Sequence, residues 1–411
     1  MSSIEKELET LRNNEYNHQQ KVNRLRRDIY HTTNHAVSDT LLDELEAEES
    51  KLEAILNQLS ILHNKTKECG LILKAKSTSK LYTDGIRGKE STGIDVKIYL
   101  RMAQIPTSFY HLLNPQTSPL ISCEIHADEE NESYRRLRVS SFIEGFSAKA
   151  VNTCELAADE KHTINQLPTL FQKPVQQLTE LTRATLNIKI EDLDGNIEQH
   201  QTYPIWMLAR TTAPLSVKDP KTGLFIDLKQ YLAAFVTPNA PDIMNFLRTA
   251  ADYHPNKSLV GYQESKENVF IQIKAIFDAL KKEAGITYVN SVICFNPNHE
   301  MMSQRIRLPR ESLTDKEANC IDGTVLYASL LEAISMNPAI VMVPGHAFIG
   351  WETWENSNDW EFLETTMTGT HTFEEACASG KKTAKRYNKT NKLKFFSIKS
   401  LRANKGITPM E

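Results

Sequence analysis

The sequence predicts a multidomain α+β protein, and three changes of residue pattern along the chain indicate it. Residues 1–66 repeat apolar positions at steps of three and four, which is typical of paired helices. Residues 93–215 alternate apolar and polar positions, which is typical of strands with one buried face. From residue 216 a helical period returns and then mixes with short strand patterns. We therefore expect an N-terminal antiparallel helical coiled coil, a β-sandwich middle domain and a C-terminal α+β domain over residues 216–411.

Composition narrows the class of protein. A chain of 411 residues is long enough for about two to four domains, and its net charge of -4 argues against a surface devoted to nucleic acid. The sequence has no apolar run near ~18 residues and no apolar signal segment at its start, so we expect no membrane contact. Its six cysteines form no closely spaced pair. This favours free thiols in a reducing cytoplasm, with no zinc or other metal site and no cofactor.

The N-terminal coiled coil is predicted from two apolar stripes, which run from Ile4 to Ile29 and from Leu41 to Leu62. Each stripe covers about four heptads, which is enough for helix pairing. Polar residues interrupt the seams at Glu15, His18 and Glu48. An antiparallel hairpin is the first choice and a parallel oligomer is the alternative, so this segment either binds a protein partner, mediates self-association or packs on the rest of the chain. Residues 67–92 are rich in Gly, Ser and Lys and are expected to be a linker.

The middle domain is predicted from short strands without helical spacers. Residues 94–100 and 184–190 alternate cleanly, and Asp194-Gly195 after the second run is a hairpin-turn signal. Such a series favours a sandwich of the immunoglobulin-like type.

Candidate catalytic residues lie on three consecutive elements near the C-terminus. Cys320 stands directly before an apolar run, 325–334, that is long enough for a helix. His346 follows a predicted buried strand and a Pro-Gly turn. Glu364 ends a second strand pattern, and a hairpin formed by 346–354 and 359–366 would bring it beside His346.

These three residue types fit nucleophilic catalysis. The thiolate is the reactive form of cysteine, and a helix N-terminus or a neighbouring imidazolium favours it. An imidazole takes the thiol proton and later returns it to a leaving group. A carboxylate on the other ring nitrogen fixes the imidazole tautomer. Taken singly, Cys320 would be read as a buried small hydrophobe and His346 as a structural residue, but their order and spacing together favour catalysis.

The pattern resembles the transglutaminase-like group of the papain superfamily, in its bacterial form. The residues that carry the resemblance are Cys320, Gly345-His346-Ala347-Phe348 and Trp360-Glu361-Phe362-Leu363-Glu364-Thr365-Thr366. The family usually has Asp at the third position, where this chain has Glu364. The resemblance covers about residues 230–370 and implies a cysteine peptidase acting on a protein or peptide. A protein-crosslinking or deamidating acyltransferase, and a non-catalytic interaction scaffold, are the alternatives.

Two further residues near Cys320 have competing interpretations. Gln304 is a candidate oxyanion donor, as a Gln is in papain-like enzymes, and a structural Gln is the alternative. Asp322 is expected to be a carboxylate favoured by the helix dipole rather than a catalytic acid. Residues 315–319 are expected to form a surface loop at the mouth of the groove.

The C-terminal segment is basic. Ten Lys and Arg residues occur between 381 and 405 without an acidic residue among them. A solvated face is the default interpretation, and binding of nucleic acid or an acidic partner is the alternative. The apolar run 393–398 predicts a strand within it.

Overall fold

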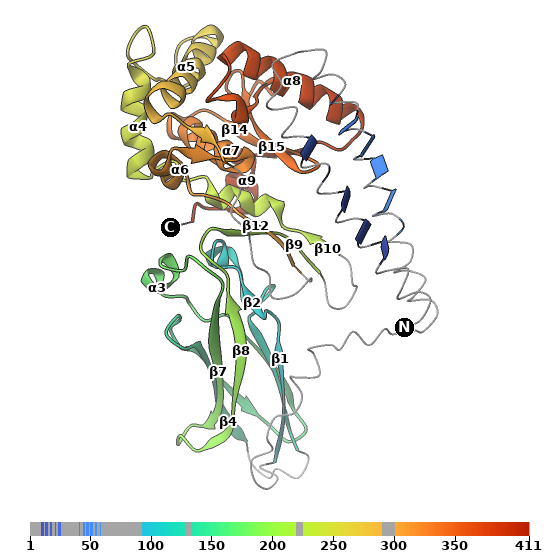
Figure 1. The fold of residues 1–411 in the computed structure, drawn as a ribbon. Coiled ribbons are helices and arrows are strands. Elements are labelled where there is room, and N and C mark those ends of the chain that lie inside the picture. Colours follow the sequence, from blue (N-terminus) through green and yellow to red (C-terminus); the bar gives the residue numbers. More distant parts are fainter. Residues whose placement is uncertain are drawn as a thin grey trace.

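The computed structural model describes residues 93–128, 134–218, 225–289 and 301–410, together with single helical residues between 10 and 58. The fold is mixed α+β. Figure 1 shows a body of strands at one end and a body of helices and strands at the other, with β9, β10 and β12 between them.

The strand-rich part contains two sheets. One has the order β1-β3-β6 and the other the order β2-β8-β7-β4-β5. Their bounds are β1 Ile94–Leu100, β2 Gln104–Ile105, β3 Ile121–Ala127, β4 Arg135–Ile143, β5 Ala150–Leu156, β6 Lys161–Gln166, β7 Thr182–Asp192 and β8 Ile197–Met207. Short helical turns lie at η2 Tyr110–Leu112 and α3 Gln172–Gln176.

One apolar core joins the two sheets. Alternate residues of β3 and β7 are buried in it, because successive side chains of a strand point to opposite faces. The expected strands 94–100 and 184–190 are confirmed, and Gly195 lies in the turn between β7 and β8 with φ of 90°. A residue with a side chain adopts this conformation at a cost, which is why glycine marks the turn.

The change from the sandwich to the next sheet occurs at residues 208–211. Strand β9 (Thr212–Lys218) pairs with β10 (Phe225–Asp227) and with β12 (Met301–Arg305), and not with the sandwich strands. The expected start of helical structure at residue 216 is therefore wrong, because 216–218 belong to β9 and 225–227 to β10. Pro214 argues against a strand in the sequence, because proline is rare within sheets. In the structure it lies where the register of β9 and β12 shifts.

The segment after β2 joins the sandwich to the rest of the chain. The Ser108 hydroxyl donates to the Thr212 carbonyl at 2.8 Å, and both residues are buried. The Thr107 hydroxyl donates to the Leu208 carbonyl at 2.9 Å. The ring of Phe109 stacks on Tyr231 with centroids 4.5 Å apart. These contacts tie the two parts together through buried groups.

The C-terminal part is built on a four-stranded antiparallel sheet of order β16-β15-β14-β17. The strands are β14 Pro338–Val343, β15 His346–Glu352, β16 Trp360–Leu363 and β17 Lys394–Ser397. Helix α7 (Cys320–Ala333) contacts β14 and β15, and helix α8 (Phe373–Lys389) contacts β16. Alternate strand residues face different cores, since Ile349 packs with α7 whereas Phe348 packs with Ala384 and Tyr387 of α8. The sheet is therefore covered on both faces.

The remaining elements surround this core. They are η3 Lys229–Phe235, α4 Pro241–Ala251, α5 Lys266–Ala279, η4 Leu280–Ala284, β11 Thr287–Tyr288, α6 Pro309–Asp315, β13 Glu317–Ala318, η5 Thr365–Met367 and α9 Ile398–Lys405. The expected surface loop at 315–319 is wrong in part, because β13 pairs with β11 and buries Ala318 and Asn319.

The basic C-terminal segment is folded into this domain. The predicted strand within 393–398 is confirmed as β17. Arg402 donates to both carboxylate oxygens of Glu332, at 3.1 and 3.0 Å, and to the carbonyls of Ala233, Val236 and Ile407. Other basic side chains bond Glu361, Asp227, Asn356 and Gln230. Part of the positive charge is thus used inside the domain.

The expected coiled coil at 1–66 and linker at 67–92 lie outside the described residues, apart from single helical positions. Among those positions, the His18 ring contacts the Glu48 carboxylate, and Leu25 and Leu45 are buried together. The hairpin and its association with a partner stay predictions. Within the described part of the chain, no helix has the length and apolar character needed to cross a bilayer.

Candidate active site

Cys320 is the first residue of α7, and the local sequence explains why the helix begins there. The Asn319 side chain accepts hydrogen bonds from the N–H groups of Ile321 and Asp322, each at 2.9 Å. This N-cap satisfies two of the first-turn donors that have no partner within the helix. Cys320 is half-buried and not in a disulfide. Its thiol therefore stands at the positive end of a helix dipole, as expected from the sequence.

Asp322 does more than complement that dipole. Its carboxylate is fully buried and accepts from the backbone N–H of Arg307 at 2.9 Å, the Arg307 guanidinium at 2.8 Å and the Asn319 N–H at 3.1 Å. Burial raises the pKa of Asp322, and these donors oppose that rise in part. Arg307 also contacts Glu317. The group fixes the start of α7 to the chain that follows β12.

His346 is the first residue of β15 and follows a tight turn from β14. It pairs with Val343 across that turn, where Gly345 has φ of 64°. The Pro344-Gly345 signal in the sequence therefore marks the place where the imidazole emerges. The imidazole side chain is 20% exposed, so it meets solvent on one side only.

Glu364 lies directly after β16. Strands β15 and β16 pair in a register that sets Ile349 opposite Leu363, so Glu364 reaches the end of β15 where His346 lies. The His346 Nε2 atom and the Glu364 Oε2 atom are 2.6 Å apart. The contact expected between these two side chains is present, and the longer Glu side chain spans the gap.

The three side chains form a connected series. Since Glu364 occupies Nε2 of His346, Nδ1 is the ring nitrogen left for Cys320, whose thiol contributes to the raised pKa of the imidazole. Burial alone would lower the pKa of His346, but the charge of Glu364 and the interaction with Cys320 outweigh it and raise that pKa to about 10. The imidazole is therefore held in its charged form at neutral pH.

The charge of Glu364 is stabilised in turn. Burial raises the pKa of its carboxyl, but His346 and Thr366 outweigh burial and lower that pKa below its ordinary value. The Thr366 hydroxyl donates to Glu364 Oε1 at 2.7 Å. Sequence reasoning gave Thr366 no role, although it stands two residues after the acid in the quoted pattern.

Two glycines allow the elements of the site to pack closely. A Cβ at Gly323 in α7 would lie 3.0 Å from the Thr365 hydroxyl oxygen. A Cβ at Gly380 in α8 would lie 2.8 Å from the backbone nitrogen of Leu363. Both glycines thus allow close contact with the segment that carries Glu364.

Gln304, the sequence candidate for the oxyanion donor, lies on β12 and pairs with Ala213 of β9. It is three residues before Arg307, whose backbone N–H is bound by Asp322 of α7. The chain bearing Gln304 is thus anchored to the helix that bears Cys320. Its role as a donor stays a prediction.

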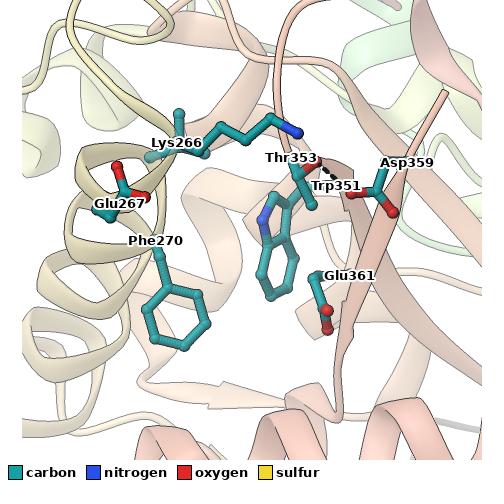
Figure 2. A pocket seen from close by; sticks show the side chains of 8 residues that line it. Lys266, Glu267, Phe270, Trp351, Thr353, Asp359 and Glu361 are labelled. Atoms are coloured by element: carbon teal, nitrogen blue, oxygen red, sulfur yellow. Dashed lines mark hydrogen bonds between the residues drawn. The ribbon is translucent and has the colours of Figure 1, made fainter. Parts of the chain in front are cut away.

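A cavity of about 240 Å³ lies away from these residues, between the start of α5 and the far end of β15. In Figure 2, Phe270 of α5 and Trp351 of β15 line the two sides of the cavity, and Thr353 is hydrogen-bonded to Asp359. Trp351 is five residues beyond His346 on the same strand. At about 3.3 Å per residue this separates the cavity from His346 by roughly 16 Å, so it is not the binding site for the atoms that react.

Comparison with known proteins adds no assignment. No protein-family model matches the sequence, and the search of curated proteins gives no match. Among the described residues, no group of three or more His, Cys, Asp or Glu side chains is arranged to hold a metal ion.

Proposed function

We propose that the chain is a cysteine-dependent hydrolase that cleaves an amide bond of a protein or peptide through an acyl-enzyme on Cys320. The observation that carries the proposal is the series Cys320, His346 and Glu364, with His346 Nε2 only 2.6 Å from the carboxylate. A thiol at a helix start, a charged imidazole and a buried carboxylate are the parts that nucleophilic catalysis requires.

The first half of the reaction uses the thiolate and the imidazolium. The Cys320 sulfur attacks the carbonyl carbon and forms a C–S bond, while the carbonyl electron pair moves to oxygen. The backbone N–H of Cys320 at the start of α7, with Gln304 as a second candidate, would donate to that oxygen. When the tetrahedral intermediate collapses, the C–N bond breaks and His346 gives its proton to the leaving amine. A thioester on Cys320 remains.

The second half restores the enzyme. Neutral His346 takes a proton from water, and the resulting hydroxide attacks the thioester carbon. The C–S bond then breaks, which yields a carboxylic acid and the Cys320 thiolate beside a charged imidazole. Glu364 is not protonated in any of these steps, because its role is to orient His346 and to stabilise the charge of the imidazolium. If an amine instead of water attacks the thioester, the product is a crosslink. If Cys320 attacks the side-chain amide of a glutamine and water then hydrolyses the thioester, the product is a deamidated side chain.

The finer fold assignments are part of the same proposal. The helix α7 packed against an antiparallel sheet, with the thiol at the helix start and the imidazole on the adjacent strand, supports a papain- and transglutaminase-like domain. The strand orders β1-β3-β6 and β5-β4-β7-β8, around one core, support an immunoglobulin-like sandwich. A cytoplasmic location suits the chemistry, since a reducing compartment keeps Cys320 as a thiol.

The test is the rate at which iodoacetamide alkylates Cys320 between pH 5 and 9, followed by mass spectrometry of peptides. Burial raises the pKa of the Cys377 thiol to about 12, so Cys377 serves as an unreactive internal control. We expect Cys320 to react rapidly at pH 6, where an ordinary thiol with a pKa near ~8.5 reacts slowly. His346→Ala is expected to slow it at least tenfold at that pH, whereas His371→Ala, at a half-buried histidine bonded to Thr370, leaves it unchanged.

Labelling that is slow at pH 6 and insensitive to His346→Ala would contradict the proposal and favour the scaffold alternative. For an active protein, incubation with a peptide mixture in H₂¹⁸O, with and without methylamine, separates the outcomes. Hydrolysis adds ¹⁸O to new C-termini, deamidation adds ¹⁸O to glutamate formed from glutamine, and acyl transfer adds methylamine.

A further inference from the structure

The two oxygens of the Glu364 carboxylate have separate partners. Oε2 meets the imidazole of His346 at 2.6 Å, and Oε1 accepts from the Thr366 hydroxyl at 2.7 Å. The backbone N–H of Thr366 also donates to Oε1, at 3.3 Å. These bonds form where Glu364 caps the short helix η5, and the Glu364 side chain is 9% exposed. Protein donors therefore hold both oxygens of a nearly buried acid.

A second tether matters more for glutamate than for aspartate. Glutamate has one more rotatable bond, and its terminal carboxylate torsion has a broad range of allowed values. A bond to Oε2 alone would fix one atom and leave the plane of the group free to turn. The bonds to Oε1 fix that plane, so that Oε2 remains directed at Nε2 of His346.

The Thr366 hydroxyl also acts on the charge of the acid. A hydrogen bond donated to a carboxylate favours its ionised form, and Thr366 contributes to the lowered pKa of Glu364. The ionised carboxylate in turn keeps the imidazolium of His346 charged. Removing the hydroxyl should weaken this chain of effects without touching the thiol or the imidazole.

We propose that Thr366 is a positioning residue of this site, which holds the Glu364 carboxylate in the orientation that orders His346. The inference rests on the proposed function for its catalytic meaning, although the orientation itself is a property of the fold. It explains how glutamate serves where the resembling family usually has aspartate. It also gives a role to the threonine that ends the pattern Trp360-Glu361-Phe362-Leu363-Glu364-Thr365-Thr366.

The decisive comparison is between Thr366→Val and Thr366→Ser. Valine keeps the shape and the backbone N–H but removes the hydroxyl, whereas serine keeps the hydroxyl and removes a methyl group. The first measurement is an NMR titration of the His346 ring, which requires no activity. We expect the midpoint in Thr366→Val to fall by about one pH unit or more, and that in Thr366→Ser to stay within about 0.3 unit of wild type. Thr370→Val, at a threonine bonded to His371 instead, should not move the His346 titration.

The second measurement is alkylation of Cys320 by iodoacetamide at pH 6. Thr366→Val is expected to react five- to tenfold more slowly than wild type, and Thr366→Ser to keep most of the rate. An unchanged His346 titration in Thr366→Val, or equal changes in the valine and serine variants, would overturn the inference. If wild-type Cys320 itself is unreactive, the proposed function fails, and the titration still decides whether Thr366 orients Glu364.

Discussion

Replacing Glu364 by glutamine is expected to convert His346 from a charged to a neutral imidazole at pH 7. Glutamine keeps the length of the side chain and an oxygen for the Thr366 hydroxyl, so the main change is the loss of one negative charge. In wild type that charge, 2.6 Å from Nε2, outweighs burial and raises the pKa of His346 to about 10. Without it, the interaction with Cys320 is the main remaining opposition to burial, and the pKa of His346 should fall below about 7.

The pairing of His346 with Glu364 also makes the stability of the wild-type protein depend on pH. The pKa of His346 in the folded protein lies above its unfolded value of 6.5, so the protonated ring stabilises the fold. This stabilisation is fully present below pH 6.5 and is lost as the pH rises through about 10. At about 1.4 kcal/mol per pH unit, the difference corresponds to at most roughly 5 kcal/mol. Because a fifth of the side chain is exposed to screening solvent, we expect about half of that.

Two measurements check this reasoning. An NMR titration of the imidazole should show a charged His346 at pH 8 in wild type and a neutral one in Glu364→Gln. Guanidinium unfolding at pH 6.5 and at pH 9.5 should show that wild type loses about 2 kcal/mol more than the variant over this interval. A wild-type His346 that is already neutral at pH 8, or identical pH dependence in the two proteins, would refute the assigned pairing.

Three further substitutions test the supports of the site. Asp322→Asn should leave the largely buried Arg307 without its main countercharge and destabilise the protein by about 3 kcal/mol in urea unfolding. Glu317→Gln, at the more exposed partner of Arg307, should cost less than about 1 kcal/mol. Equal costs would contradict the inference that the buried ion pair contributes more to stability than the exposed one. Gly380→Ala should force α8 away from β16, which should destabilise the protein by about 1–3 kcal/mol and slow the alkylation of Cys320. Ser379→Ala, at the neighbouring position of α8, is the control. Unchanged alkylation in a folded Gly380→Ala variant would show that the position of Glu364 does not depend on this contact. Arg402→Met should make the segment after α9 sensitive to proteolysis, because Arg402 is hydrogen-bonded to Glu332 and to three backbone carbonyls. Lys405→Ala removes one bond to Gln230 and should leave the segment resistant. Equal resistance of the two variants would argue against Arg402 as the residue that holds this segment.

Patterns of short range could be predicted from the sequence. The alternation in 94–100 and 184–190, the turn at Gly195 and the apolar run after Cys320 each reflect a local period, and each forms the expected element. The order of Cys320 at a helix start, His346 on a strand and Glu364 after the next strand also follows from local signals. A hairpin places its two strands side by side, which is why a contact of His346 with Glu364 could be suggested from the sequence. The register that makes this contact depends on which faces are buried, and it is seen only in the fold.

Elements that depend on distant partners could not be predicted in this way. Strand β9 contains Pro214 and forms only because β10 and β12 pair with it. Asp322 carries no sequence mark of burial, and its pairing with Arg307 requires the chain after β12 to meet α7. Gly380 looks like an ordinary weak helix position until α8 is packed on β16.

The sequence by itself determined which side chains carry the candidate chemistry and in what order they stand on their elements. The tertiary structure alone decided that Glu364 reaches His346 at 2.6 Å, that Thr366 holds its other oxygen and that the imidazole is buried enough for one carboxylate to govern its charge. The physical reason is that residue type and period are local properties. Distance, burial and the resulting electrostatics arise only when separate segments pack together.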